Sequence, residues 1–358
     1  MPTNVIGWDI GGAHLKAARV TEDGFIEQVI QTACPLWKGI DTLHGALEAV
    51  INGFGQSQVD QSYHGITMTG ELADLFPNRE EGVKQLLNTV SQYLPAGKTE
   101  VFVGQTGFLG VGQLDGALYE IIASANWMAT ALFAASQIGS ALFVDIGSTT
   151  TDIMVLSKGD VDARGLTDYQ RLHYEELVYS GLVRTPIMAV VNAVPFEGQW
   201  ISLMSEHFAT LADVYRLCSE LPDHVDQMPT ADGNEKTLVG SARRLARMLG
   251  RDLESAPMVD WQRLAGFIKR KHIETLQSAC ERQLSRGLLS EDAPIIGAGV
   301  GRYLVKEIAG RLGHTYIDFA DFVSVGNDDV GSFSVADCAP AVATAILLLN
   351  QQAILDLE

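Results

Sequence analysis

The segment 142–156 holds residue types that suit the binding of phosphate and a hydrated metal ion. Two apolar runs flank a turn with a carboxylate, a glycine and consecutive hydroxyls, namely Asp145, Gly147, Ser148, Thr149 and Thr150. Apolar runs joined by a glycine-containing turn are typical of a β-hairpin. Backbone N–H groups and hydroxyls in such a turn can bind phosphate oxygens, and the carboxylate suits a hydrated Mg²⁺. We therefore expect a phosphate-binding hairpin here.

The segment 5–20 repeats this pattern. Its turn and the residues that follow contain Asp9, Gly11, Gly12, His14 and Lys16. A carboxylate and a phosphate repel each other, whereas an intervening Mg²⁺ makes both contacts attractive. We therefore expect Asp9 and Asp145 to be catalytic and to hold Mg²⁺ through water, with Lys16 and His14 beside the anion. The alternatives are that the aspartates only cap turns and that Lys16 is an outward strand lysine.

A further acidic position follows the strand expected at 63–68. The polar end of a strand is where α/β folds place ligand groups, and Glu71 and Asp74 stand there. We expect Glu71 to accept the proton of a phenol or alcohol. A nearby carboxylate and a cation would help to ionise a phenol, which titrates near ~10. The alternative for both acids is a solvated helix N-terminus.

For several other charged residues and histidines the neighbouring sequence does not indicate one particular role. Arg184 could bind phosphate through its planar guanidinium, with a structural ion pair as the alternative. Asp232 and Lys236 stand in a loop that could cover a substrate, although an ordinary surface loop is favoured. His207 and His272 are expected at the surface, and no pair of histidines has zinc spacing.

The elements that must position these residues alternate between strands and helices. Period-2 and 3.6-residue patterns predict strands at 5–9, 15–20, 25–30, 63–68, 100–103, 142–156 (a hairpin), 187–191, 294–296 and 315–319, and helices at 40–54, 83–94, 124–137, 238–249, 261–276, 302–312 and 337–351. A helical, charged region at about 200–276 is expected to be an insertion. A glycine-rich loop, Gly297, Ala298, Gly299, Val300 and Gly301, follows one of the later strands.

Composition limits the classes of function. The 358 residues and 47% hydrophobic content favour two domains, and a formal net charge of −19 argues against nucleic acid or membrane partners. The isolated cysteines, Cys34, Cys218, Cys280 and Cys338, are expected to be reduced and mostly buried. Residues 121–144 carry no charge but are interrupted by polar residues, so a buried helix and strand are expected there. We expect a cytoplasmic protein without a secretory signal, acting on small molecules, with a homodimer left open.

The two expected hairpins and the glycine-rich loop at 297–301 resemble the nucleotide-binding loops of the actin-like ATPase superfamily, which includes sugar kinases and the 70-kDa heat-shock chaperones. Asp9-Ile10-Gly11-Gly12 with Lys16 matches the first phosphate loop of that superfamily, and Asp145-Ile146-Gly147-Ser148-Thr149 matches the second. The loop at 297–301 matches its adenosine loop, so Gly297, Ala298, Gly299 and Gly301 are implied to bind nucleotide. The final helix matches its connecting helix. The resemblance implies Mg²⁺, with ATP or a diphosphate substrate in one cleft between the domains.

Within that superfamily, Asp145–Asp152 and Ala125-Asn126-Trp127 resemble the hydantoinase/oxoprolinase branch, and Tyr179–Pro186 resembles the small members of that branch. The length is similar to that of its small members in methanogens and methylotrophs, which are linked to the tetrahydromethanopterin one-carbon pathway. For that subgroup the resemblance implies a step of methanofuran synthesis. An aminomethyl-furan-methyl diphosphate is joined to the phenol oxygen of a glutamyl-tyramine or tyrosine acceptor, with release of pyrophosphate.

We therefore predict an α/β protein with the two-domain actin-like (ribonuclease H-like) ATPase fold. The first domain comprises residues 1–135 and 337–358, and the second comprises 136–336 with the helical insertion. An ATP-dependent small-molecule kinase and a nucleotide-gated regulatory ATPase are the alternative functions. The lack of paired cysteines weighs against an iron–sulfur activator ATPase.

Overall fold

The computed structural model describes residues 4–326 and 331–355. The chain divides into two units. The first comprises Met1–Ala141, Leu156–Asp168 and Ile317–Glu358, and the second comprises Leu142–Val155 and Tyr169–Tyr316. The predicted boundaries at 135 and 337 differ from these limits. One reason is that β15 (Ser324–Val325) pairs with β3 (Phe25–Ala33) in the sheet of the first unit.

A mixed sheet carries the first hairpin. Its strand order is β15-β3-β2-β1-β4-β5-β6, in which β1, β2 and β3 are antiparallel neighbours while β1, β4 and β5 run parallel. The remaining strands are β1 (Val5–Ile10), β2 (His14–Val20), β4 (Tyr63–Met68), β5 (Thr99–Phe102) and β6 (Phe108–Gly110). The helices of this unit are α1 (Asp41–Phe54), α2 (Gln56–Gln61), α3 (Arg79–Val90), α4 (Gly116–Ile122), α5 (Asn126–Gln137) and α11 (Ala339–Leu355).

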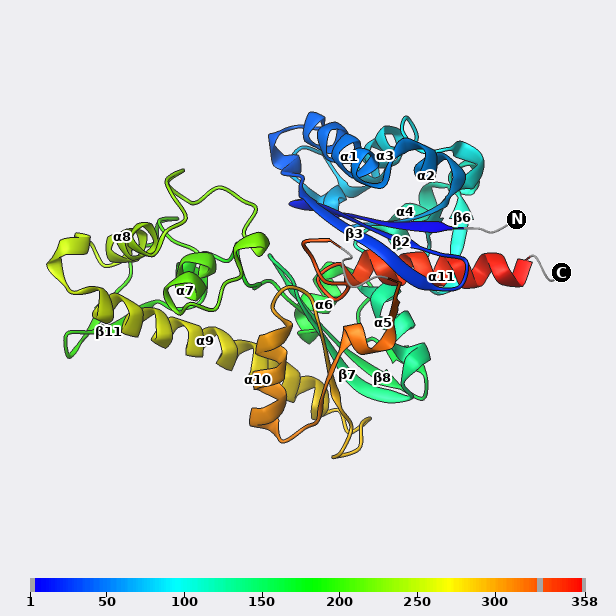
Figure 1. Ribbon diagram of the computed structural model, residues 1–358. Helices are drawn as coiled ribbons and strands as arrows, with labels where there is room; N and C mark the ends of the chain where they lie inside the picture. The colour runs from blue at the N-terminus through cyan, green and yellow to red at the C-terminus, as the bar shows by residue number, and fades with distance from the viewer. Residues whose placement is uncertain (1–3, 327–330, 356–358) are drawn as a thin grey trace. The chain divides into compact units, whose positions relative to one another are not determined.

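Alternation along β1 separates an apolar face from the face that carries Asp9. Trp8 and Ile10 are buried among apolar residues of α1 and α3. Gly7 points the other way, and a Cβ there would lie 2.1 Å from the backbone oxygen of Ala341 in α11. Figure 1 accordingly shows α1 and α3 on one side of the strands and α11 on the other. Asp9 lies two residues after Gly7 and therefore on the same face of the sheet, which is the face that α11 covers.

The second unit is built on a sheet with the order β10-β8-β7-β13-β14, in which β7 and β13 run parallel. The strands of this sheet are β7 (Ser140–Ile146), β8 (Thr151–Ser157), β10 (Leu177–Val178), β13 (Ile295–Ala298) and β14 (Tyr316–Asp318), with a separate hairpin of β11 (Ala193–Phe196) and β12 (Gln199–Ser202). The strand β9 (Asp160–Asp162) pairs with β8 but lies in a segment of the first unit. The helices are α6 (Asp168–Tyr174), α7 (Leu211–Leu217), α8 (Leu238–Met248), α9 (Met258–Leu284) and α10 (Arg302–Leu312). The helices α7, α8 and α9 form the predicted helical insertion, and Figure 1 shows α7 and α8 beside α9.

Two local predictions need correction. The strand expected at 187–191 is a short 3₁₀ helix, Ile187–Ala189. Pro186 precedes it and cannot donate to a strand ladder, so the pairing here is limited to an isolated antiparallel bridge between Pro186 and Thr210. The helix expected at 83–94 is α3, which begins earlier because the side chain of Asn78 caps it by accepting a hydrogen bond from the N–H of Glu81.

His272 is also placed differently from the prediction. It lies fully buried in α9, with its Nδ1 2.7 Å from the hydroxyl of Tyr215 in α7. Burial lowers the pKa of His272 to about 4, because the charged form would lose its hydration. This histidine is therefore a neutral core residue, whereas His207 is exposed as expected.

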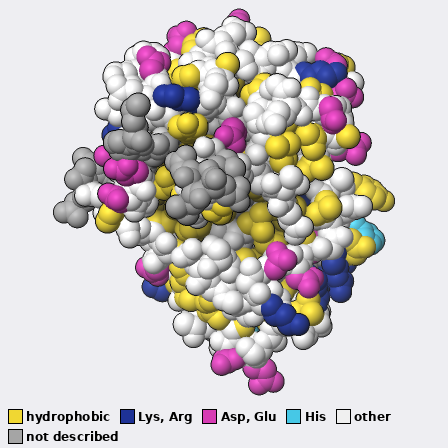
Figure 2. Space-filling view, turned by 90° about the vertical axis from the view of Figure 1, so that its right-hand side faces the viewer, with side chains coloured by type: hydrophobic (Ala, Val, Ile, Leu, Met, Phe, Trp, Pro, Cys, Tyr) yellow, Lys and Arg dark blue, Asp and Glu magenta, His cyan; other side chains and the backbone are white. Residues whose placement is uncertain are grey.

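Other features of the described chain agree with the sequence. Cys34, Cys280 and Cys338 are buried and Cys218 is half-buried, and all of them are free thiols. None of the helices in residues 4–326 and 331–355 has the length and apolar character needed to cross a membrane. On the face drawn in Figure 2, acidic and basic side chains are interspersed with hydrophobic and other groups.

Candidate functional site

The turn between β1 and β2 presents unused backbone donors. The N–H of Gly11 donates to the carbonyl of His14 (2.9 Å), and the carbonyl of Gly12 accepts from the N–H of Leu36 (3.1 Å). Within the described chain, the N–H groups of Gly12 and Ala13 donate to no protein acceptor. A Cβ on Gly11 would lie 2.8 Å from the carbonyl oxygen of His14, so this tight turn requires glycine. Free N–H groups held in such a turn suit an anion.

The turn between β7 and β8 has the same hydrogen bonds. The N–H of Gly147 donates to the carbonyl of Thr150 (2.9 Å), and the carbonyl of Ser148 accepts from Val183 and Arg184 at 3.0 and 2.9 Å. Among the residues that the structure describes, the N–H groups of Ser148 and Thr149 likewise have no protein acceptor. The two predicted phosphate loops are thus alike in geometry as well as in sequence.

Asp9 lies at the centre of a polar cluster in the first unit. Its carboxylate is buried, with Lys16 Nζ 3.9 Å from Oδ2 and Asn126 Nδ2 donating to Oδ1 at 3.3 Å. Thr67 pairs with Asp9 in the strand register, and its buried Oγ1 has no hydrogen-bond partner in the described part of the chain. His14 is also buried, at the start of β2. Asn126 and Thr67 were not predicted as site residues.

The side chains around the second loop include a cation. Arg184 Nη1 donates to Thr149 Oγ1 at 3.3 Å, and burial lowers the pKa of the guanidinium. Ser148 Oγ is buried and finds no partner in residues 4–326 and 331–355. Gly181 lies directly on the loop, since a Cβ there would be 2.6 Å from both the oxygen of Gly147 and the nitrogen of Thr149. Arg184, Ser148 and Thr149 therefore meet at this turn, and their role as phosphate ligands stays a prediction.

The glycine loop at 297–301 packs closely against β7 and its neighbours. A Cβ on Gly299 would lie 2.2 Å from Oδ1 of Asp145, a half-buried residue at the end of β7. A Cβ on Gly301 would lie 2.4 Å from Cγ2 of Ile146, and one on Gly297 would lie 2.6 Å from the ring of Tyr316. Packing alone therefore requires these glycines, and their contact with a nucleotide stays a prediction.

Glu71 is the most deeply buried of the predicted catalytic acids. It lies in the short 3₁₀ helix Gly70–Leu72 and is 1% exposed, so the alternative of a solvated helix N-terminus is wrong for it. Ser124 Oγ donates to Oε1 at 2.8 Å, while Oε2 has no partner in the part of the chain described. Burial raises the pKa of Glu71 to about 7, although the Ser124 hydrogen bond and the charge of Arg79 oppose the rise. Asp74 is exposed.

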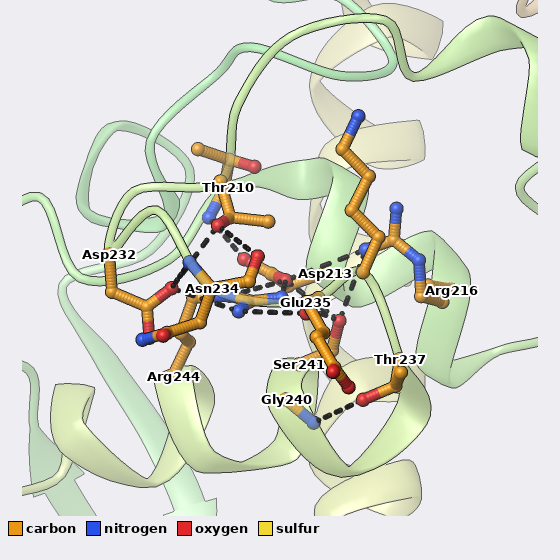
Figure 3. A network of polar contacts seen from close by, with 12 residues as sticks. Thr210, Asp213, Arg216, Asp232, Asn234, Glu235, Thr237, Gly240, Ser241 and Arg244 are labelled. Atoms are coloured by element: carbon orange, nitrogen blue, oxygen red, sulfur yellow. Dashed lines mark hydrogen bonds and ion pairs between the residues drawn. The ribbon is translucent and has the colours of Figure 1, made fainter.

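The loop that holds Asp232 and Lys236 is fixed by ion pairs (Figure 3). Arg244 is fully buried, with its guanidinium 2.7 Å from Asp213 Oδ1 and 3.1 Å from Asp232 Oδ1. Burial opposes ionisation of Asp232, but hydrogen bonds from Asn234 and the charge of Arg244 outweigh it and lower its pKa. Lys236 Nζ lies 3.5 Å from Asp226 Oδ1. We assign these residues a structural role.

The cluster around Asp9 offers few direct ligands for a metal ion. No group of three or more His, Cys, Asp and Glu side chains in residues 4–326 and 331–355 could hold one. Mg²⁺ keeps several of its waters and is commonly bound through one or two carboxylates together with phosphates. Asp9, beside the unpartnered hydroxyl of Thr67, fits an ion held through water.

The two hairpins, their sheets and the helical insertion define a two-domain actin-like (ribonuclease H-like) ATPase fold. Among solved structures, nucleotide-free acetone carboxylase, from work on ATP-dependent acetone carboxylation, is similar with a TM-score of 0.59 and 11% identity. The match covers 96% of this chain and 70% of that one, and it shows the fold alone.

Residues 62–327 match the hydantoinase/oxoprolinase family, and the chain belongs to that family. It is 29% identical over 352 residues to (4-{4-[2-(gamma-L-glutamylamino)ethyl]phenoxymethyl}furan-2-yl)methanamine synthase of Methanocaldococcus jannaschii, covering 98% of this chain and 99% of that protein. It is 32% identical over 210 residues to the protein of the same name from Methanococcus vannielii, covering 59% of this chain and 91% of that protein.

Proposed function

We propose that this chain is a synthase of methanofuran-type cofactor biosynthesis. The phenol oxygen of a glutamyl-tyramine or tyrosine acceptor attacks the methylene carbon of an aminomethyl-furan-methyl diphosphate. A C–O bond to the aryl oxygen forms, the C–O bond to the diphosphate breaks, and pyrophosphate leaves. The observation that carries the proposal is the similarity to the Methanocaldococcus synthase along 98% of this chain, whose printed name describes a phenoxymethyl-furan product.

Glu71 is the proposed acceptor of the phenol proton. A phenol titrates near ~10 and an ordinary glutamate near ~4.3, so proton transfer between them is uphill by about 8 kcal/mol. A carboxylate whose pKa is raised to about 7 reduces that difference by about 4 kcal/mol. Oε2 needs a hydrogen-bond donor, which the phenol O–H would supply. The burial of Glu71 thus supports the role of base.

The two turns are the proposed phosphate-binding elements. The unused N–H groups of Gly12 and Ala13 in one turn, and of Ser148 and Thr149 in the other, suit phosphate oxygens. The guanidinium of Arg184 adds positive charge beside the second turn. Asp9 and Asp145 would each hold Mg²⁺ through water, and the bound metal would neutralise charge on the diphosphate and so make it a better leaving group. Fixed donors of this kind stabilise charge that grows on pyrophosphate as it departs.

The test is reconstitution with defined components. Purified protein, Mg²⁺, the furylmethyl diphosphate and glutamyl-tyramine are incubated without ATP, and the aryl ether and pyrophosphate are quantified in equal molar amounts. Glu71→Gln, which retains the shape of the side chain but cannot accept the proton, serves as the matched control and should form at least 100-fold less ether. Absence of the ether with the wild-type protein would overturn the proposal. Phosphorylation of the acceptor when ATP is added would instead indicate a kinase.

A further inference from the structure

Ser124 bridges two carboxylates in the first unit. Its Oγ lies 2.8 Å from Oε1 of Glu71 and 3.1 Å from Oδ2 of Asp168. A serine hydroxyl carries one proton and can accept as well as donate. Ser124 can therefore donate to only one of these carboxylates at a time, and it can accept a hydrogen bond from the other when that group is protonated.

The two carboxylates differ in their contact with solvent. Glu71 is 1% exposed, whereas the side chain of Asp168 is 15% exposed and forms an ion pair with Arg79. Ser124 adopts a φ of 53°, in the left-handed region that favours glycine and costs about 1–2 kcal/mol for other residues. The fold thus keeps a hydroxyl between the buried and the more exposed carboxylate in spite of that cost.

From this geometry we infer that Ser124 and Asp168 form a proton outlet for Glu71. The inference rests on the proposed function, in which Glu71 accepts the phenol proton. The protonated Glu71 donates its proton to Ser124 Oγ while the Ser124 hydroxyl proton passes to the carboxylate of Asp168. Glu71 returns to the carboxylate, Ser124 to the hydroxyl, and Asp168 then loses the proton to water. Ser124 and Asp168 are positioning residues, since neither is placed against the substrate.

The charged groups that face Glu71 are Arg79, from α3, and Asp168. Their effects, together with that of Ser124, give opposite predictions for two variants. In Ser124→Ala the carboxylate loses a hydrogen bond that favours its charged form, so Glu71 should titrate at higher pH. In Asp168→Asn a repelling negative charge is removed, so Glu71 should titrate at lower pH. Each midpoint should move by roughly one pH unit, which is the effect of one hydrogen bond to a charged group for Ser124→Ala and of one nearby like charge for Asp168→Asn.

The first experiment needs no substrate. The carboxyl carbon of Glu71 is followed by ¹³C NMR from pH 5 to 9 in the full-length protein, with the signal assigned by its loss in Glu71→Gln. Ser136→Ala is the matched control, because it removes a serine hydroxyl bonded to the carbonyl of Phe133 in α5. We expect an upward shift for Ser124→Ala, a downward shift for Asp168→Asn and no shift for the control. The inference would be overturned if the two variants shifted the Glu71 titration in the same direction, or if neither variant shifted it.

The second experiment measures proton release during a single turnover, with a pH indicator in weak buffer. In Asp168→Asn the half-time of proton release should be at least ten times the half-time of ether formation, and imidazole should restore the rate of proton release. Simultaneous ether formation and release in Asp168→Asn would contradict the outlet. If no ether forms even with the wild-type protein, the proposed function fails, while the titrations still decide whether Ser124 and Asp168 control the proton on Glu71.

Discussion

Replacing Gly181 with alanine should displace the loop 147–150. The new Cβ would lie 2.6 Å from the oxygen of Gly147 and the nitrogen of Thr149, and 2.7 Å from the carbonyl carbon of Ser148. Ordinary contacts between carbon and other heavy atoms begin near ~3.5 Å, so the loop or the segment that carries Gly181 must move by about 1 Å. All of the close atoms belong to the backbone, which cannot avoid the contact by rotating a side chain. A misplacement of this size in a site that orients reacting groups costs about 100-fold in rate.

The assay compares Gly181→Ala with a glycine variant that has room for its methyl group. Gly310 lies in α10 of the same unit, and a Cβ there meets no atom within 4 Å. We expect kcat/KM for the diphosphate to fall about 100-fold in Gly181→Ala and to remain unchanged in Gly310→Ala. Urea unfolding should show a loss of about 1–3 kcal/mol for Gly181→Ala, the usual cost of overpacking. A folded Gly181→Ala protein with the wild-type kcat/KM would refute a role of this loop in binding the diphosphate.

Three further predictions concern charged side chains. Asp9→Ala and Asp145→Ala should each lower kcat by at least 100-fold at saturating Mg²⁺ without loss of the folded circular dichroism spectrum, and full activity of both would refute their assignment. Burial raises the pKa of Glu71 from 4.5 to about 7, so wild-type stability should fall by about 3 kcal/mol as pH rises from 4.5 through 7. Glu71→Gln should abolish this dependence in urea titrations, and an unchanged slope would contradict it. Arg244→Met should cost about 2–3 kcal/mol in the same measurement, because the buried Asp213 would lose its 2.7 Å contact with a guanidinium and keep only the more distant one of Arg216, at 3.7 Å, and a loss below 1 kcal/mol would argue against a structural role.

The phosphate turns could be predicted because their signals are local. A strand pattern, a glycine where the turn closes and an aspartate at the strand end all lie within about ten residues of one another. Both hairpins form where the sequence places them, and their hydrogen bonds agree. Glu71 follows the end of β4 as the sequence predicts, although its burial was not expected.

The partners of these residues could not be found in the same way. Ser124 meets Glu71, and Asn126 meets Asp9, only because the start of α5 folds against two strand ends that are distant in sequence. No local pattern carries that information. The burial of His272, by contrast, had a signal, since it stands four residues after Ile268 and four before Leu276 on the apolar face of α9. The 3.6-residue period of apolar positions in α9 indicates burial of this residue more strongly than the general tendency of histidine indicates exposure.

The two turns have the same backbone hydrogen-bond pattern, but the charged side chains beside them differ. Lys16 stands seven residues after Asp9, directly opposite it in the β1–β2 register, so the first hairpin contains its own cation. The residue seven positions after Asp145 is Asp152, whose Oδ1 lies 2.7 Å from the guanidinium of the buried Arg171. The second hairpin therefore has a neutralised acid where the first has a lysine, and positive charge reaches its turn from Arg184, outside the hairpin. Because the segment 181–184 also holds the turn carbonyls, the position of that charge and the shape of the turn depend on the same hydrogen bonds.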